Sequence, residues 1–347
     1  MKIGLDATYS LGDHLSGVGV YSREILSGLP AAHPEASYLF CYRPNRFLRA
    51  MREQRAPRSL LWKDWPRSVD LFHALNQRVD SARFPRTVTT FHDLFVMTGE
   101  YSTPEFRRRF AKQAQLAAGR SDLIIAVSQF TADQVHELLN VERARLRVIP
   151  HGSAPSRSRL GLRSRPGLQV CERLILFVGA IQKRKNVAAL VRAFGQVEPG
   201  WRLVLAGSSG YGAPEIVEAV ERSPRSSDIE LPGYVSDDEL ERLYARASVF
   251  AFPSLDEGFG IPVLEAMSRG VPVLTSNGSA LREVAGDAAL LVNPREPEEI
   301  AAGLKRLTED PQLRQTLAAK GRARSAEFTW DRAIESTWSV YTELMRQ

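Results

Sequence analysis

The stretch FPSLDEGFGIPVLEAMSRG, from Phe252 to Gly270, predicts a buried strand, a tight turn and a helix in direct succession. Pro262 suits the first turn of that helix. The turn itself is made of Gly258, Phe259 and Gly260. Such a loop lies at the carboxyl edge of a parallel sheet, where open α/β folds bind ligands. The start of the helix favours an anion such as phosphate.

Two glutamates of this stretch, Glu257 and Glu265, lie eight positions apart. Helical periodicity places Glu265 on the same face as Ile261 and Leu264, toward the protein, where a carboxylate is costly unless it is hydrogen-bonded or paired. Ligand hydroxyls would meet that need, a ribose diol at Glu265 and a sugar at Glu257. A buried ion pair of Glu265 with an arginine and a solvated Glu257 explain the same residues. The residues leave both interpretations open.

Strand-like and helix-like segments alternate along the chain, which predicts a doubly wound α/β architecture. Short apolar runs predict buried parallel strands. In the first half these are residues 2–7, 38–42, 71–74, 87–91, 123–127 and 146–149. In the second half they are residues 174–178, 202–206, 229–231, 249–252, 271–275 and 288–292.

The chain of 347 residues is long enough for two domains. The segment HGSAPSRSRLGLRSRPGL, residues 151–168, is rich in Ser, Gly, Pro and Arg and predicts a linker. The predicted domains are residues 1–160 and 169–327. Residues 328–347 form an amphipathic helix that we expect to pack on the N-terminal domain.

Composition excludes several classes of protein. Cys41 and Cys171 are the only cysteines and lie far apart, which argues against a disulfide framework or a zinc site. The N-terminus MKIGLDATYS predicts a strand rather than a signal peptide, and no apolar run approaches the roughly 18 residues that span a bilayer. We therefore expect a cytoplasmic protein.

Charge is distributed unevenly along the chain. Residues 1–165 hold 25 Lys and Arg against 15 Asp and Glu, whereas residues 166–347 hold 21 against 25. The basic half suggests anionic partners, or a solvated arginine-rich surface. Two basic segments within it, PNRFLRAMREQR and EFRRRFAKQAQ, resemble interfacial helices or ordinary helices with a core stripe. Their apolar residues are Phe47, Leu48, Met51, Phe106 and Phe110.

A second anion signal is FVGAIQKRKN, residues 177–186, which follows a predicted strand. Lys183, Arg184 and Lys185 precede a helix that Asn186 is suited to cap. Cations are disfavoured at the start of a helix, so an anion is expected to share the site, although an exposed basic loop explains the same residues. Two anion-suited loops in one sheet predict a diphosphate ligand.

The first half carries weaker signals. In SGVGVYSREIL, Gly17 and Gly19 open a predicted helix, but the dinucleotide fingerprint is incomplete, which argues against a nicotinamide dehydrogenase. The segment TTFHDL places His92 and Asp93 at the carboxyl edge of the sheet, and His73 has a similar placement. A histidine at such a position is explained equally by a structural role.

Together these motifs resemble the retaining glycosyltransferases of family four, which have the GT-B fold. The resemblance covers nearly the whole chain, and its most specific part is the spacing of Glu257 and Glu265 inside SLDEGFGIPVLEAMSRGVPVL. GYVSDDELERLYARASVFAFPS and REVAGDAALLVNPREPEEI match as well. GAIQKRKN is similar to the form GTLEPRKN of bacterial mannosyltransferases, with departures at Ala180, Gln182 and Lys183. The resemblance implies two Rossmann-like domains that face each other across a cleft.

The resemblance also implies roles for individual residues. Glu265 is expected at the ribose, Glu257 at the donor sugar, and Arg184 with Lys185 at the diphosphate. His92 is expected beside the transferred sugar. The remaining donor-site residues that it implies are Gly17, Gly179, Val235, Gly258, Phe259, Gly260 and Leu264.

The implied reaction moves a hexose from a nucleotide sugar to a hydroxyl of a glycan or lipid-linked glycan in cell-surface polysaccharide synthesis, with anomeric retention. The mannosyltransferase-like motif favours GDP-mannose as donor. No metal and no other cofactor are expected, nor is a nucleic-acid partner. Peripheral contact with the inner face of the membrane is a further hypothesis. The alternatives are a catalytically silent scaffold that binds nucleotide sugars, or another GT-B enzyme such as an epimerase or a phosphorylase.

Overall fold

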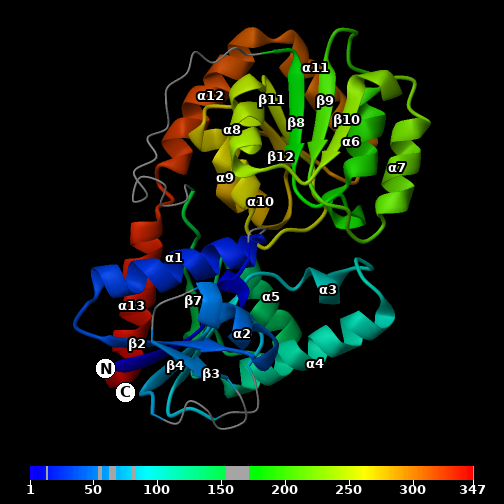
Figure 1. The fold of residues 1–347 in the computed structure, drawn as a ribbon. Helices are drawn as coiled ribbons and strands as arrows, with labels where there is room; N and C mark the ends of the chain where they lie inside the picture. The colour runs from blue at the N-terminus through cyan, green and yellow to red at the C-terminus, as the bar shows by residue number, and fades with distance from the viewer. Residues whose placement is uncertain (13–14, 54–56, 62–67, 80–82, 154–171, 347) are drawn as a thin grey trace. The chain divides into compact units, whose positions relative to one another are not determined.

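The computed structural model describes residues 1–12, 15–53, 57–61, 68–79, 83–153 and 172–346 (Figure 1). Contacts divide the chain into two compact units. Unit 1 consists of Met1–Leu160 and Phe328–Gln347, and unit 2 consists of Gly161–Glu327. Most of the predicted linker, together with Cys171, lies outside the described residues.

The described strands of unit 1 form one parallel sheet in the order β3-β2-β1-β4-β5-β6-β7. They are β1 (Lys2–Asp6), β2 (Ser37–Tyr42), β3 (Arg58–Leu60), β4 (Leu71–Ala74), β5 (Thr87–Phe91), β6 (Leu123–Ala126) and β7 (Leu146–Val148). Strand β3 was not predicted, because this edge strand has only three residues, all half-buried, and lacks an apolar run. The other strands confirm their predictions.

Helices cover both faces of the sheet in unit 1. They are α1 (Gly17–Ala32), α2 (Pro44–Glu53), α3 (Phe95–Thr98), α4 (Pro104–Arg120), α5 (Gln129–Leu139) and α13 (Trp330–Arg346). Residues of α1, α2 and α13 share one core cluster with Ile125 of β6, while residues of α4 and α5 share the other with its neighbour Ile124. This alternation is the one expected of a strand buried on both faces.

The described strands of unit 2 form a second parallel sheet, in the order β10-β9-β8-β11-β12-β13. This is the doubly wound order. From β8 the chain adds β9 and β10 on one side, and it then adds β11, β12 and β13 on the other side, so the strand order reverses between β8 and β11. The strands are β8 (Leu174–Val178), β9 (Arg202–Ala206), β10 (Ile229–Gly233), β11 (Val249–Phe252), β12 (Val273–Ser276) and β13 (Leu290–Val292). The predicted pair of doubly wound domains is therefore confirmed.

The helices of unit 2 connect successive strands and end in a C-terminal group. They are α6 (Val187–Phe194), α7 (Ala213–Glu221), α8 (Asp237–Arg246), α9 (Ile261–Ser268), α10 (Ser279–Ala285), α11 (Pro297–Glu309) and α12 (Pro311–Ser325). Within the described parts of both units, no helix combines the length and apolar character needed to cross a membrane.

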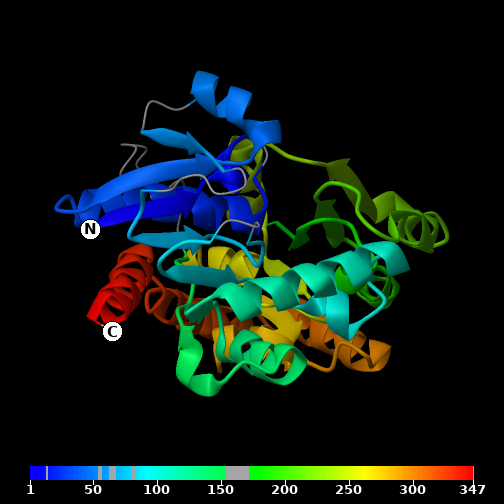
Figure 2. The ribbon, with the colours of Figure 1, turned by 90° about the horizontal axis from the view of Figure 1, so that it is seen from below.

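Helix α13, drawn in red near the C-terminus in Figure 2, belongs to unit 1, and its buried side chains complete the core of that unit. The Tyr341 hydroxyl lies 2.6 Å from Nδ1 of His73, and Nε2 of His73 lies 2.8 Å from the hydroxyl of Thr90. That hydroxyl in turn lies 2.9 Å from the hydroxyl of Tyr21 on α1. A buried chain of hydrogen bonds therefore links the C-terminal helix, the sheet and the first helix.

Three histidines of unit 1 are held neutral in this core. Burial lowers the pKa of His73 to about 3 and that of His92 to about 4. Burial also lowers the pKa of His151 well below its ordinary value. Because the unfolded chain takes up protons near pH 6.5 and the folded unit does not, stability is complete above that pH and is lost as the pH falls below it.

We predict that unit 1 loses stability between pH 6.5 and pH 4. At pH 5 the penalty is on the order of 2 kcal/mol for each of His73 and His92. His73→Gln is expected to reduce the slope of unfolding free energy against pH by about 1.4 kcal/mol per pH unit, which urea titrations at several pH values measure. His136 on α5 is half-buried outside this core, where its Nδ1 donates to the carbonyl of Val141 at 2.8 Å, so His136→Gln serves as the control. Equal slopes for His73→Gln and wild type would contradict the prediction.

Candidate functional site

Two loops meet at the point in unit 2 where the strand order reverses. One follows β8 and runs from Gly179 to Asn186, and the other follows β11 and leads to Gly260. Gly179 has a φ of +147°, and a Cβ added at Gly207 would lie 1.9 Å from the carbonyl oxygen of Gly179. The segment after β9, which contains Gly207, and the loop after β8, which contains Gly179, approach each other so closely that no side chain fits at Gly207. The predicted site therefore lies where doubly wound sheets bind ligands.

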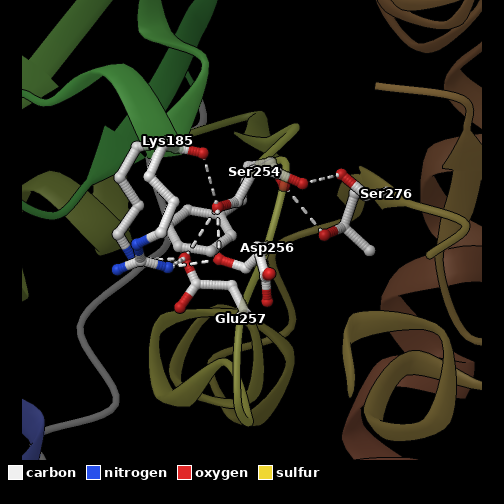
Figure 3. Close-up of polar contacts among 8 residues, drawn as sticks. Lys185, Ser254, Asp256, Glu257 and Ser276 are labelled. Carbon is white, nitrogen blue, oxygen red and sulfur yellow. Dashed lines mark hydrogen bonds and ion pairs between the residues drawn. The ribbon is translucent and has the colours of Figure 1, made fainter. Parts of the chain in front are cut away.

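Glu257 is the centre of a buried ion-pair cluster in these loops, shown in Figure 3. Its Oε1 lies 2.8 Å from Nη1 of Arg184 and 2.5 Å from Nζ of Lys185. Nζ of Lys185 also lies 4.5 Å from the ring centroid of Phe252. All three charged residues are over 90% buried, so the interpretations of a solvated Glu257 and an exposed Arg184–Lys185 pair are wrong.

Two serines brace the cluster, as Figure 3 also shows. The Ser254 hydroxyl donates to Oε1 of Glu257 at 2.7 Å, and the Ser276 hydroxyl donates to the carbonyl of Ser254 at 2.6 Å. The Arg184 guanidinium donates to the carbonyl of Asp256, and the amide of Leu255 donates to the carbonyl of Arg184 at 2.9 Å. The two loops are therefore joined through side chains and backbone, and the charged groups are preorganised.

The charges determine the protonation of Glu257. Burial by itself would raise the pKa of this carboxyl, but the positive charges of Arg184 and Lys185 outweigh it and lower the pKa to about 2. Glu257 is therefore an anion at neutral pH and a weak base. Carboxylates with such a pKa are poor acceptors of a proton from a sugar hydroxyl.

Glu265 lies on α9, partly buried, and has a different environment. Its carboxylate accepts a hydrogen bond from the hydroxyl of Tyr244 on α8 at 3.2 Å. Burial raises the pKa of Glu265, against the opposing charge of Arg269. Arg269 donates to Oε2 of Glu241 at 3.0 Å and to the backbone carbonyl of Glu265 at 2.9 Å.

Glu265 was interpreted either as the partner of a buried arginine or as an acceptor for ligand hydroxyls, and its contacts bear on both. The salt bridge of Arg269 is made with Glu241, and among the described residues Glu265 takes part in one side-chain hydrogen bond, with Tyr244. A carboxylate accepts more than one hydrogen bond, which leaves acceptor capacity at Glu265 for ligand hydroxyls.

The remaining predicted residues of unit 2 have distinct surroundings. Gly260 has a φ of +109°, and a Cβ there would lie 2.6 Å from Cδ2 of Leu281, so the turn requires glycine. Gly258 and Phe259 are buried in the same loop. Leu264 is fully buried in the core, and half-buried Val235 lies between β10 and α8. The side chain of Asn186 donates to the carbonyl of Pro294 at 2.7 Å, so the predicted side-chain cap of α6 is wrong.

In unit 1, Gly17 is the first residue of α1 and His92 follows β5. Nε2 of His92 donates to the carbonyl of Leu75 at 2.9 Å, and its Nδ1 lies 3.4 Å from Nε2 of His151. His151 was interpreted as the start of a linker and was missed, because sequence alone does not show that it stacks on His92. Ser254 and Tyr244 were also missed, although Ser254 lies inside the most specific motif.

Comparisons with known proteins identify the family of this chain. The model of the family described as "Glycosyl transferases group 1" matches residues 162–324, and that of "Glycosyltransferase Family 4" matches residues 15–157. The chain is 33% identical over 269 residues to the O-antigen chain mannosyltransferase B of Escherichia coli, covering 75% of this chain and 71% of that protein. It is 30% identical to the serotype-specific mannosyltransferase WbdA of Escherichia coli, but it spans only 34% of that protein.

Solved structures show the same architecture. HepE from Anabaena in complex with UDP and glucose matches with a TM-score of 0.77 at 18% identity, covering 99% of this chain and 100% of that one. The two doubly wound units thus define a GT-B fold. The chain belongs to the family-four glycosyltransferases, the family that the sequence motifs resemble.

We predict that Glu257→Gln destabilises unit 2, because it leaves two buried cations without their carboxylate. At pH 7 the loss of unfolding free energy is expected to be about 3 kcal/mol or more. The difference from wild type is expected to shrink as the pH falls from 4.5 toward 2, where Glu257 itself becomes protonated.

Urea unfolding across this pH range is the measurement, with Glu239→Gln as the matched control. Glu239 pairs with Arg242 on the surface of α8, where the loss of an ion pair is expected to cost less than about 1 kcal/mol. Equal effects of the two substitutions would show that the buried cluster contributes no more than a surface pair.

Proposed function

We propose that this protein is a retaining glycosyltransferase that moves mannose from GDP-mannose to a hydroxyl of a glycan in cell-surface polysaccharide synthesis. The observation that carries the proposal is the preorganised cluster of Arg184, Lys185 and Glu257 at the switch point of unit 2. The names of the relatives, both mannosyltransferases of Escherichia coli, support mannose and polysaccharide synthesis.

The cluster suits a nucleoside diphosphate that carries the sugar. Glu257 holds the cations of Arg184 and Lys185 in one place. A bound diphosphate would share those cations, and Glu257 would then direct its second oxygen to hydroxyls of the sugar. Glu265 would accept from the ribose diol with the capacity that Tyr244 leaves.

The difficult step is the departure of the nucleoside diphosphate, because negative charge grows on its leaving oxygen. Positively charged side chains fixed in a buried site stabilise such charge without reorganisation. Arg184 and Lys185 are proposed to supply this stabilisation, so the reaction would need no bound metal.

Retention of the anomeric configuration needs either an enzyme nucleophile or attack from the side of the leaving group. Glu257 is a weak candidate for nucleophile or base, because its pKa is about 2 and its Oε1 is tied to two cations. We therefore favour front-face attack. The acceptor oxygen bonds to the anomeric carbon as the bond to the phosphate oxygen breaks, and the acceptor proton moves to the departing diphosphate.

The donor proposal predicts selective binding of guanine nucleotide sugars. In a thermal-shift and hydrolysis panel of GDP-, UDP-, ADP- and dTDP-sugars, we expect GDP-mannose to stabilise the protein most. Glu265→Ala and Lys185→Ala are each expected to weaken binding at least tenfold, the loss typical of one charged hydrogen bond.

Lys183→Ala is the matched control, because Lys183 is the exposed neighbour in the same turn. Stabilisation by a UDP-sugar instead would keep the enzyme class and change the donor. If no nucleotide sugar shifts the unfolding temperature, the silent scaffold becomes the better interpretation.

Peripheral membrane contact is proposed for α2, where Leu48 is 73% and Met51 57% exposed among arginines. Phe47 and Phe110 pack against core clusters of unit 1, so they do not belong to this surface. Apolar side chains beside cations on one helix favour an anionic lipid interface.

We predict that the double variant Leu48→Ser, Met51→Ser sediments with anionic vesicles at least tenfold more weakly than wild type, since two exposed apolar contacts are lost. Leu138→Ser on α5 is the control, because Leu138 is 37% exposed on another helix. Identical sedimentation of the double variant and wild type would exclude α2 as the contact.

A further inference from the structure

Unit 1 contains a pocket of about 270 Å³, and none of its described lining residues was predicted for the donor site. The loop after β1 contributes Thr8 and Tyr9 to its wall, and Ser16 precedes α1. Arg43 directly follows β2, Arg46 lies in the first turn of α2, and Arg78 follows β4. The pocket therefore lies at the carboxyl ends of adjacent strands, the edge where doubly wound sheets bind ligands.

The described charged residues that line this pocket are all arginines: Arg43, Arg46 and Arg78. Asp6 lies beneath them, fully buried, with Oδ2 3.2 Å from Nη2 of Arg43. A fourth cation is close, since a Cβ added at Gly12 would lie 3.7 Å from Nη2 of Arg49. Like charges gathered in a concave surface raise the local concentration of anions.

Two helices also begin at this pocket. Ser16 caps α1, and Asn45 and Arg46 lie in the first turn of α2. Neither helix has an acidic residue in its first turn, so the positive ends of both are uncompensated by their own side chains. Arg46 adds a cation where the helix dipole already disfavours one. An anion would satisfy both helix ends and the arginines together.

The walls of the pocket are held in place by the fold. Arg23 of α1 donates to the carbonyls of Ser10 at 2.9 Å and Gly12 at 2.5 Å, which braces the loop after β1. The amide of Arg43 donates to the Thr8 hydroxyl at 3.2 Å, and its guanidinium donates to the carbonyl of Arg78 at 2.9 Å. A preorganised site loses little conformational entropy when a ligand binds.

We propose that this pocket binds a phosphate or diphosphate ester carried by the acceptor. The inference rests on the proposed function, in which unit 2 holds the donor with its own cations, Arg184 and Lys185. Guanidinium groups match the oxygens of phosphate in bidentate geometry, and hydroxyls of Thr8, Tyr9 and Ser16 supply further hydrogen bonds. The acceptor is thus a phosphorylated saccharide, either lipid-linked or soluble.

The experiment measures calorimetric binding of inorganic diphosphate and of farnesyl diphosphate to the full chain, with the unit 2 site first saturated by GDP. Arg46→Gln and Arg78→Gln are each expected to weaken both ligands at least tenfold, and raised salt to weaken them further. Both arginines are exposed, so neither substitution removes core packing. Arg52→Gln is the matched control, because it removes the same charge from α2 away from the pocket.

The same titrations distinguish a lipid-linked acceptor from a soluble phosphorylated one. Tighter binding of farnesyl diphosphate than of inorganic diphosphate, lost in Leu48→Ser, supports a lipid-linked acceptor, since Leu48 is exposed two residues after Arg46. Equal binding of both ligands supports a soluble phosphorylated acceptor.

Two outcomes would overturn the inference. One is diphosphate affinity that is the same in wild type, Arg46→Gln and Arg78→Gln. The other is a matching loss of GDP affinity in those variants, which would assign the pocket to the donor. Failure of the proposed function has a different signature, namely no binding of any nucleotide sugar while diphosphate binding in unit 1 persists.

Discussion

The buried contact of one carboxylate with two cations organises unit 2. Glu257 joins the loop after β11 to Arg184 and Lys185 in the loop after β8, at the only reversal of strand order among the described strands of that sheet. Buried charges are tolerated when they are paired and hydrogen-bonded, and here Ser254 completes the pairing. The same constraint places positive charge at the carboxyl edge of the sheet. The stability of the loops and the proposed binding of a diphosphate therefore share one origin.

Unit 1 is organised by neutral polar groups instead. Tyr341, His73, Thr90 and Tyr21 form a buried chain from the C-terminal helix to the first helix. His73 is buried and hydrogen-bonded to two hydroxyl groups rather than to a carboxylate, so burial keeps it neutral. Arginines of unit 1 gather around the pocket after β1 and on α2. This group of cations is the basis for the proposal that unit 1 binds an anionic acceptor.

The residues of the motif around Glu257 and Glu265 were predicted from the sequence because the elements that position them follow one another directly along the chain. A few consecutive residues encode a strand, a glycine turn and a helix. Gly260 in the turn has a φ of +109°, and Pro262 lies in the first turn of the helix. The arginine pocket was not found, because Arg43 and Arg78 are 35 residues apart and meet only when β2 and β4 flank β1. The short edge strand β3 was not predicted for a related reason: it is a strand because it pairs with β2, and it has no apolar run that the sequence would show.

The sequence by itself determined the alternating α/β plan, the strands of both sheets apart from β3, the spacing of Glu257 and Glu265, and the family. Periodicity and turn chemistry carry that information over short distances. Only the tertiary structure decided that Glu257 pairs with Arg184 and Lys185, that Glu265 accepts from Tyr244, and that His92 contacts His151. These partners lie 21 to 73 residues apart, so their charge states depend on which loops the two sheets bring together.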